Sequence, residues 1–80
     1  MPTVFFVTAL IVLNVQPSLG WIQYTYPYDD IKLCQKYIKH QKDSILLSIG
    51  KHFGSKLVSV ETFECMTRKE AVKRNTELGH

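Results

Sequence analysis

Residues 57–66 read Leu-Val-Ser-Val-Glu-Thr-Phe-Glu-Cys-Met, and this stretch decides the fold that the sequence predicts. Its β-branched residues and its alternation of apolar with polar side chains indicate a β-strand. Alternation places Val58, Val60 and Thr62 on one face of that strand, and Leu57, Phe63 and Cys65 on the other. The predicted strand therefore carries a cysteine on a largely apolar face.

Turn and cap signals enclose this strand. Before it, residues 50–55 (Gly-Lys-His-Phe-Gly-Ser) contain two glycines and are typical of a turn. After it, Thr67 and Glu70 have the spacing of a capping box, which predicts a short polar helix over residues 68–78. Within that helix Glu70 and Arg74 are one turn apart and are expected to pair.

An amphipathic helix is expected before the turn. Asp29 or Asp30 is a good N-cap for it, because a short carboxylate side chain accepts hydrogen bonds from the first free amides. At 100° per residue, one side of this helix is formed by Leu33, Cys34, Tyr37, Ile38, Gln41 and Ile45. The opposite side carries Lys32, Lys36, Lys39 and Asp43.

The end of this helix is open to two interpretations. Leu46 and Leu47 would both point into the polar side if the helix continued. We therefore expect the helix to end near Asp43 or Ser44 and a second strand to begin at about Ile45. The alternative is one helix that continues to Ile49, with Gly50 as its C-terminal cap.

Residues 21–28 (Trp-Ile-Gln-Tyr-Thr-Tyr-Pro-Tyr) form an aromatic segment of extended character. Pro27 excludes a helix here and favours an edge strand or an arm. The segment either folds over a small core or exposes an aromatic anchor for a partner, since Trp and Tyr are enriched among the residues that dominate interface energies. The candidate partner-binding residues are Trp21, Tyr24, Tyr26 and Tyr28.

Residues 1–20 have the features of a signal peptide. Residues 4–15 contain ten apolar and no charged residues, which suits a secretory h-region and is too short to span a bilayer as a helix. Gln16-Pro17 follows, and the small residues Ser18 and Gly20 predict cleavage between Gly20 and Trp21. A buried core element is the alternative. Cleavage would leave one small secreted domain, residues 21–80, in which no further apolar run could span a membrane.

Cys34 and Cys65 are the only cysteines. In an oxidising compartment they are expected to form a disulfide, which stabilises so small a chain by about 3–4 kcal/mol. Two free thiols or an intermolecular bridge are the alternatives. Neither cysteine lies in a Cys-x-x-Cys motif or a Cys/His cluster, so the sequence disfavours metal binding and thiol redox chemistry.

The charge pattern favours an extracellular binding role. All ten basic and seven acidic residues follow Gly20, and the net charge of +3 is far below that of nucleic-acid-binding proteins. The candidate basic face, Lys32, Lys36 and Lys39, is either an ordinary solvated helix face or, as an alternative, a surface for anionic membranes, as in cationic amphipathic peptides.

No pattern predicts catalysis or a cofactor. His40, His52 and His80 are isolated from any serine or cysteine nucleophile, and there is no glycine-rich phosphate loop or metal-ligand spacing. Asp29 and Asp30 are explained by helix capping. We expect a non-enzymatic protein with no catalytic residues, no metal and no cofactor.

Residues 45–53 (Ile-Leu-Leu-Ser-Ile-Gly-Lys-His-Phe) and 61–67 (Glu-Thr-Phe-Glu-Cys-Met-Thr), after an amphipathic segment, resemble the N-terminal portion of tick salivary lipocalins, the histamine-binding-like family. The resemblance implies that residues 45–53 form a first barrel strand and residues 63–65 a cysteine-bearing second one. It also implies a biogenic amine as ligand. The lipocalin Gly-x-Trp signature is absent, and about 60 residues cannot supply eight strands. The resemblance therefore implies a truncated or fragmentary member with an incomplete pocket.

The predicted fold is small α+β: an aromatic arm, one amphipathic helix, two short antiparallel strands, a weak C-terminal helix and one disulfide. The predicted function is a secreted, non-enzymatic binding protein or effector, of salivary or venom type, that acts on an extracellular protein or small-molecule ligand. A lipocalin-like small-ligand binder and a cationic membrane-active peptide are the alternatives.

Overall fold

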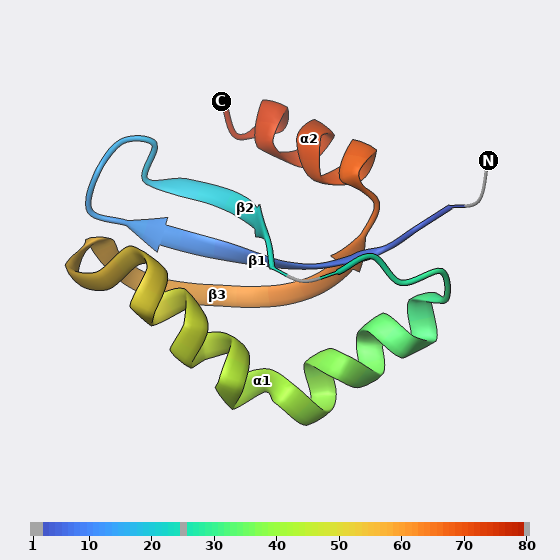
Figure 1. Ribbon diagram of the computed structural model, residues 1–80. Helices are drawn as coiled ribbons and strands as arrows, with labels where there is room; N and C mark the ends of the chain where they lie inside the picture. Colours follow the sequence, from blue (N-terminus) through green and yellow to red (C-terminus); the bar gives the residue numbers. More distant parts are fainter. Residues whose placement is uncertain (1–2, 25, 80) are drawn as a thin grey trace.

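The computed structural model describes residues 3–24 and 26–79. Three strands, two helices and one short 3₁₀ turn follow one another along the chain (Figure 1). Their bounds are β1 Phe6–Leu13, β2 Leu19–Gln23, α1 Ile31–Phe53, η1 Gly54–Lys56, β3 Leu57–Met66 and α2 Arg68–Glu77. His80, the third predicted isolated histidine, lies outside the described residues, as do the first two residues of the predicted signal peptide.

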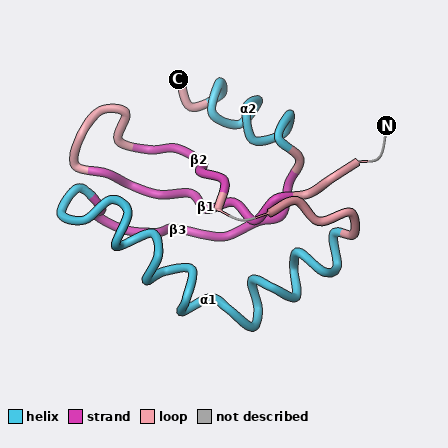
Figure 2. The backbone as a smooth tube through the Cα atoms, in the orientation of Figure 1, coloured by secondary structure: helices cyan, strands magenta, loops and turns pink. Residues whose placement is uncertain are grey.

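The strands form one antiparallel sheet in the order β2-β1-β3, with α1 across one face and α2 near the other (Figure 2). The predicted class, small α+β with one disulfide, is confirmed, although the sheet has three strands rather than two. Of the two predicted strands only β3 is present, and β1 and the first two residues of β2 come from the segment that was predicted as a signal peptide.

β1 is the central strand, and its apolar sequence suits that position. Val7, Ala9 and Ile11 are almost fully buried in one core with Cys34, Ile45 and Ile49 of α1. A strand covered on both faces needs apolar residues on both, so its sequence is as nearly continuously apolar as that of a secretory h-region. The residues on either side of the predicted cleavage site, Gly20 and Trp21, are both paired with β1.

α1 continues through the position where a second strand was expected, and that prediction is wrong. The helix bends at Gln41, where the backbone leaves helical geometry (φ −121°, ψ 20°). Beyond it Ile45 and Ile49, one turn apart, are buried. The alternative end at Gly50 is also too early, because Gly54 caps the helix with its N–H donating to the carbonyl of Gly50.

The predicted N-terminal caps of both helices are confirmed. The Asp30 carboxylate accepts a hydrogen bond from the Lys32 amide at 2.9 Å, and α1 begins at the next residue after Asp30. The Thr67 hydroxyl accepts one from the Glu70 amide at 3.1 Å, and α2 ends at Glu77, one residue before its predicted limit. Each of these helix starts is specified by residues within one turn of it.

β3 has the predicted bounds but not the predicted faces. Its register against β1 shifts between Leu10 and Ile11 and again between Val12 and Leu13. A register shift of one residue moves the following side chains to the opposite face. Val60 was predicted to lie on the other face of the strand from Phe63. Both side chains instead pack against the core, whereas Val58 is 62% exposed.

Cys34 and Cys65 form the predicted disulfide, with their Cα atoms 6.0 Å apart. Cys65 is paired with Val7, which faces α1, and Cys34 is completely buried on the sheet-facing side of that helix. The bridge therefore joins α1 to β3 within the core.

Candidate binding surface

Three tyrosines from the segment after β2 and one from α1 gather around an open hollow of about 660 Å³. These residues, Tyr24, Tyr26, Tyr28 and Tyr37, are called the tyrosine surface below. Tyr26 is 85% exposed, whereas the other three are partly buried and pack on the edge of the core. Tyrosine combines a large apolar ring with a polar tip, so such a surface can bury area and still form hydrogen bonds.

The first strand of the sheet holds the backbone of the tyrosine surface in place. The Tyr24 amide donates to the carbonyl of Val7 at 2.8 Å. Tyr28 and Phe5 exchange two backbone hydrogen bonds, each 2.7 Å long. The tyrosine surface therefore depends on residues 5–7.

Tyr37 is the member of the tyrosine surface with a perturbed hydroxyl. Its ring centroid lies 6.1 Å from that of Tyr28, with the planes tilted by 40°. Burial raises the pKa of Tyr37 above its ordinary value of 10.0, and Tyr24 and Tyr28 raise it further by charge interactions. A side-chain hydrogen bond with Tyr24 is the smallest contribution in the same direction. Tyr37 is thus a neutral hydroxyl at physiological pH.

Trp21, the fourth predicted partner-binding residue, is separated from the three tyrosines. It lies in β2 opposite Leu10, on the sheet face near α2. The Arg74 guanidinium lies 5.1 Å from the centre of its ring. Its backbone forms two hydrogen bonds with the Asn75 side chain, of 2.7 and 3.1 Å. These contacts indicate that Trp21 fastens α2 to the sheet.

Arg74 links three elements of the fold. Its guanidinium pairs with Glu64 of β3 at 2.7 Å and with Glu70 of α2 at 3.1 Å, the second being the predicted one-turn pair. The hydrogen bond to Glu64, followed by the one to Glu70, raises the pKa of Arg74. All three side chains are about a third or more exposed, so these pairs position α2 and contribute little to the free energy of folding.

Tyr37 was not among the predicted site residues, because helical periodicity placed it on the buried side with Cys34. Periodicity states which side of a helix is apolar, but not which other segment that side meets. The position of Tyr37, one turn after a cysteine expected to bridge to a strand, was the one local signal that it lies close to the sheet.

The basic face lies where the sequence predicts it. Lys32, Lys36 and Lys39 are exposed along the first half of α1, on the side away from the buried Cys34. In the part of the chain that the structure describes, no helix has both the length and the apolar character needed to cross a bilayer.

The described residues bring no three His, Cys, Asp or Glu side chains together in the manner of a metal site. His52 packs edge-on against Phe53, with ring centroids 4.8 Å apart. Cys34 is bonded to Cys65 and is not a free thiol. The absence of a metal or catalytic residue stays a prediction.

Comparison of the chain with models of protein families, with curated proteins and with solved structures finds no match. The lipocalin resemblance is therefore neither supported nor refuted as a relationship. Of the strands it implies, residues 63–65 do lie in β3, but residues 45–53 are helical. That part of the implied barrel is wrong.

Proposed function

We propose that this protein is a secreted, non-enzymatic binding protein that contacts an extracellular target through the tyrosine surface. The observation that carries the proposal is the hollow lined by Tyr24, Tyr26, Tyr28 and Tyr37, of which Tyr26 is largely exposed. Aromatic residues presented in this way are the commonest energetic anchors of protein interfaces.

Two features support the extracellular location. The disulfide between Cys34 and Cys65 is a bond that persists in oxidising compartments. The apolar N-terminal segment followed by small residues has the pattern of a secretory leader. Expression of the full chain in a secretory cell line tests this part: we expect the protein in the medium, and its retention inside the cells would contradict the proposal.

The binding part is tested with the full chain and two exposed-residue variants. The wild-type protein is screened against arrayed extracellular proteins, and affinities are measured for each target found. Tyr26→Ala removes an exposed ring, so we expect an unchanged fold by circular dichroism and a loss of affinity of about 30-fold or more, as for other interface anchors.

Val58→Ala is the matched control, because this side chain is exposed on β3 outside the tyrosine surface. It should leave the affinity unchanged. Equal affinities of wild type and Tyr26→Ala, or equal losses in the two variants, would mean that binding does not use the tyrosine surface.

A further inference from the structure

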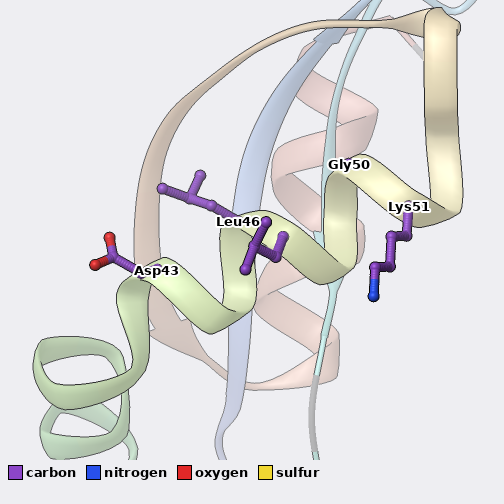
Figure 3. A pocket seen from close by; sticks show the side chains of 5 residues that line it. Asp43, Leu46, Gly50 and Lys51 are labelled. Carbon is purple, nitrogen blue, oxygen red and sulfur yellow. The ribbon is translucent and has the colours of Figure 1, made fainter.

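The outer side of α1 beyond its bend carries an unusual combination of residues. Asp43, Leu46, Leu47, Gly50 and Lys51 border an open hollow of about 610 Å³ (Figure 3). Leu47 is 68% exposed, more than any other aliphatic side chain in the described part of the chain. Ile45 and Ile49 face the core, and Leu47, midway between them in sequence, points in the opposite direction.

The hollow has the geometry of a knobs-into-holes site. Asp43, Leu46, Leu47 and Gly50 are spaced i, i+3, i+4 and i+7, which are the four positions that surround a side chain inserted from a neighbouring helix. Gly50 leaves the hole open, because no atom lies within 4 Å of where its Cβ would be. A helix that packs here can approach closely.

We infer that this surface binds a second copy of the same chain, with the two α1 helices antiparallel and the two-fold axis beside Leu47. In that arrangement each Leu47 inserts into the hole of the other copy. Asp43 lies four residues before Leu47 and Lys51 four residues after it. The axis therefore brings Asp43 of each copy beside Lys51 of the other, twice in the same interface.

Charge complementarity is what selects a second copy and an antiparallel orientation. A parallel pair would place Asp43 beside Asp43 and Lys51 beside Lys51, and like charges at these positions would oppose association. The antiparallel pair also sets Gly50 at the level of Ser44 of the other copy, so that small residues lie on both sides of the axis.

The extent of the contact follows from the ends of the straight part of α1. The bend at Gln41 and the helix end at Phe53 limit symmetric pairing to residues 42–52, about three turns. Lys32, Lys36 and Lys39 lie on the other arm of the bent helix, outside the paired turns (Figure 1). So small an interface predicts a weak dimer that forms as the concentration rises.

Sedimentation velocity of the full chain from about 10 μM to about 1 mM tests the inference over the range where weak interfaces associate. We expect a monomer–dimer equilibrium, with a dissociation constant at least about tenfold higher for Leu47→Gln. Val72→Gln, a change at a similarly exposed side chain of α2, should leave it unchanged. A wild-type protein that stays monomeric throughout, or a Leu47→Gln dimer as tight as wild type, would overturn the inference.

Charge variants test the orientation. Asp43→Lys and Lys51→Asp should each weaken self-association by about tenfold, because each creates two like-charged contacts. An equimolar mixture of these two variants should associate more tightly than either alone, and the double variant Asp43→Lys/Lys51→Asp should recover the wild-type constant. Charge variants with no effect on association would show that Asp43 and Lys51 do not meet across the interface.

Discussion

Thr8 shows how a single residue adapts β1 to a buried position. It is the one fully buried polar side chain among the described residues, and its hydroxyl donates to the carbonyl of Glu64 at 2.8 Å. A buried hydroxyl without a partner would cost roughly 1–3 kcal/mol. The hydrogen bond removes that cost and ties the central strand to β3 at the residue pair that the register already joins.

Tyr37 predicts a stability change at alkaline pH. Because burial and its neighbours raise the pKa of Tyr37 in the folded protein, the folded state holds the phenolic proton more tightly than the unfolded state. This contribution to stability is fully present below the ordinary pKa of 10.0 and is lost as the pH rises through the folded pKa. We expect urea unfolding to show a smaller alkaline loss of stability in Tyr37→Phe than in wild type.

Val58→Ala is the control for that experiment, since it changes an exposed side chain that does not titrate. It should follow the wild-type dependence on pH. If wild type and Tyr37→Phe lose stability equally above pH about 10, Tyr37 is not the residue responsible.

At the scale of elements, α1 shows that apolar residues on the polar side of a helical wheel do not require the helix to end. A single wheel over residues 31–53 places Leu46 and Leu47 on the polar side, which favoured a break and a strand. The structure keeps the helix: Ile45 and Ile49 are buried, and Leu47 is exposed on the side where the wheel places it. The exposed leucine is thus a consequence of a continuous bent helix.

The disulfide gives a prediction at the same scale, because it connects α1 to β3 across a sequence separation of 31 residues. Closing a loop of this length stabilises a protein by about 3–4 kcal/mol in the chain-entropy account. We expect a reductant to lower the free energy of unfolding by that amount, measured in urea.

The double variant Cys34→Ser/Cys65→Ser supplies the control for reduction. It should be as unstable as the reduced wild type and should not respond to reductant. A protein that migrates as a covalent dimer on a non-reducing gel would instead support the intermolecular bridge that the sequence left open.

At the scale of the whole molecule, the topology depends on β1. Within the sheet, β2 and β3 do not pair with each other, and each is paired with β1 between them. Without residues 5–13, the core loses Val7, Ala9 and Ile11, and the tyrosine surface loses the backbone partners of Tyr24 and Tyr28. The same residues therefore cannot both form the central strand and be removed as part of a cleaved leader.

We predict that residues 21–80 alone do not form this fold. The truncated chain should lack cooperative unfolding by circular dichroism, whereas the full chain should show it. In the full chain, Ala9→Asp should have the same effect because it places a charge in the core, while Val15→Asp, at an exposed position, should not. A truncated chain that unfolds as cooperatively as the full one would refute the prediction.

The intact mass of the secreted protein then shows whether the N-terminal residues are retained or are removed with a leader. The form that carries the tyrosine surface is expected to retain residues 5–13. A mass equal to residues 21–80 less two hydrogens, with both regained on reduction, would confirm the predicted cleavage and disulfide. It would also mean that the secreted form has a different fold from the one described here.

The sequence alone determined the features whose causes are local. The bounds of β3 follow from its own alternation, and the starts of both helices follow from cap residues within one turn. Cys34 and Cys65 are the only cysteines, so the sequence named the one pairing possible within the chain and left free thiols and an intermolecular bridge as alternatives. Three of the four members of the tyrosine surface were also named from an aromatic segment that a proline keeps out of helix.

Only the tertiary structure decided what each apolar segment contacts. An apolar run such as residues 4–15 satisfies a secretory leader and a central strand equally, because hydrophobicity states that a segment avoids water but not what replaces the water. The register shifts of β3, the bend of α1 and the meeting of Tyr37 with Tyr28 likewise depend on residues distant in sequence. These features arise when the sheet and the helix pack against each other, and a local sequence pattern does not predict which segments will be in contact.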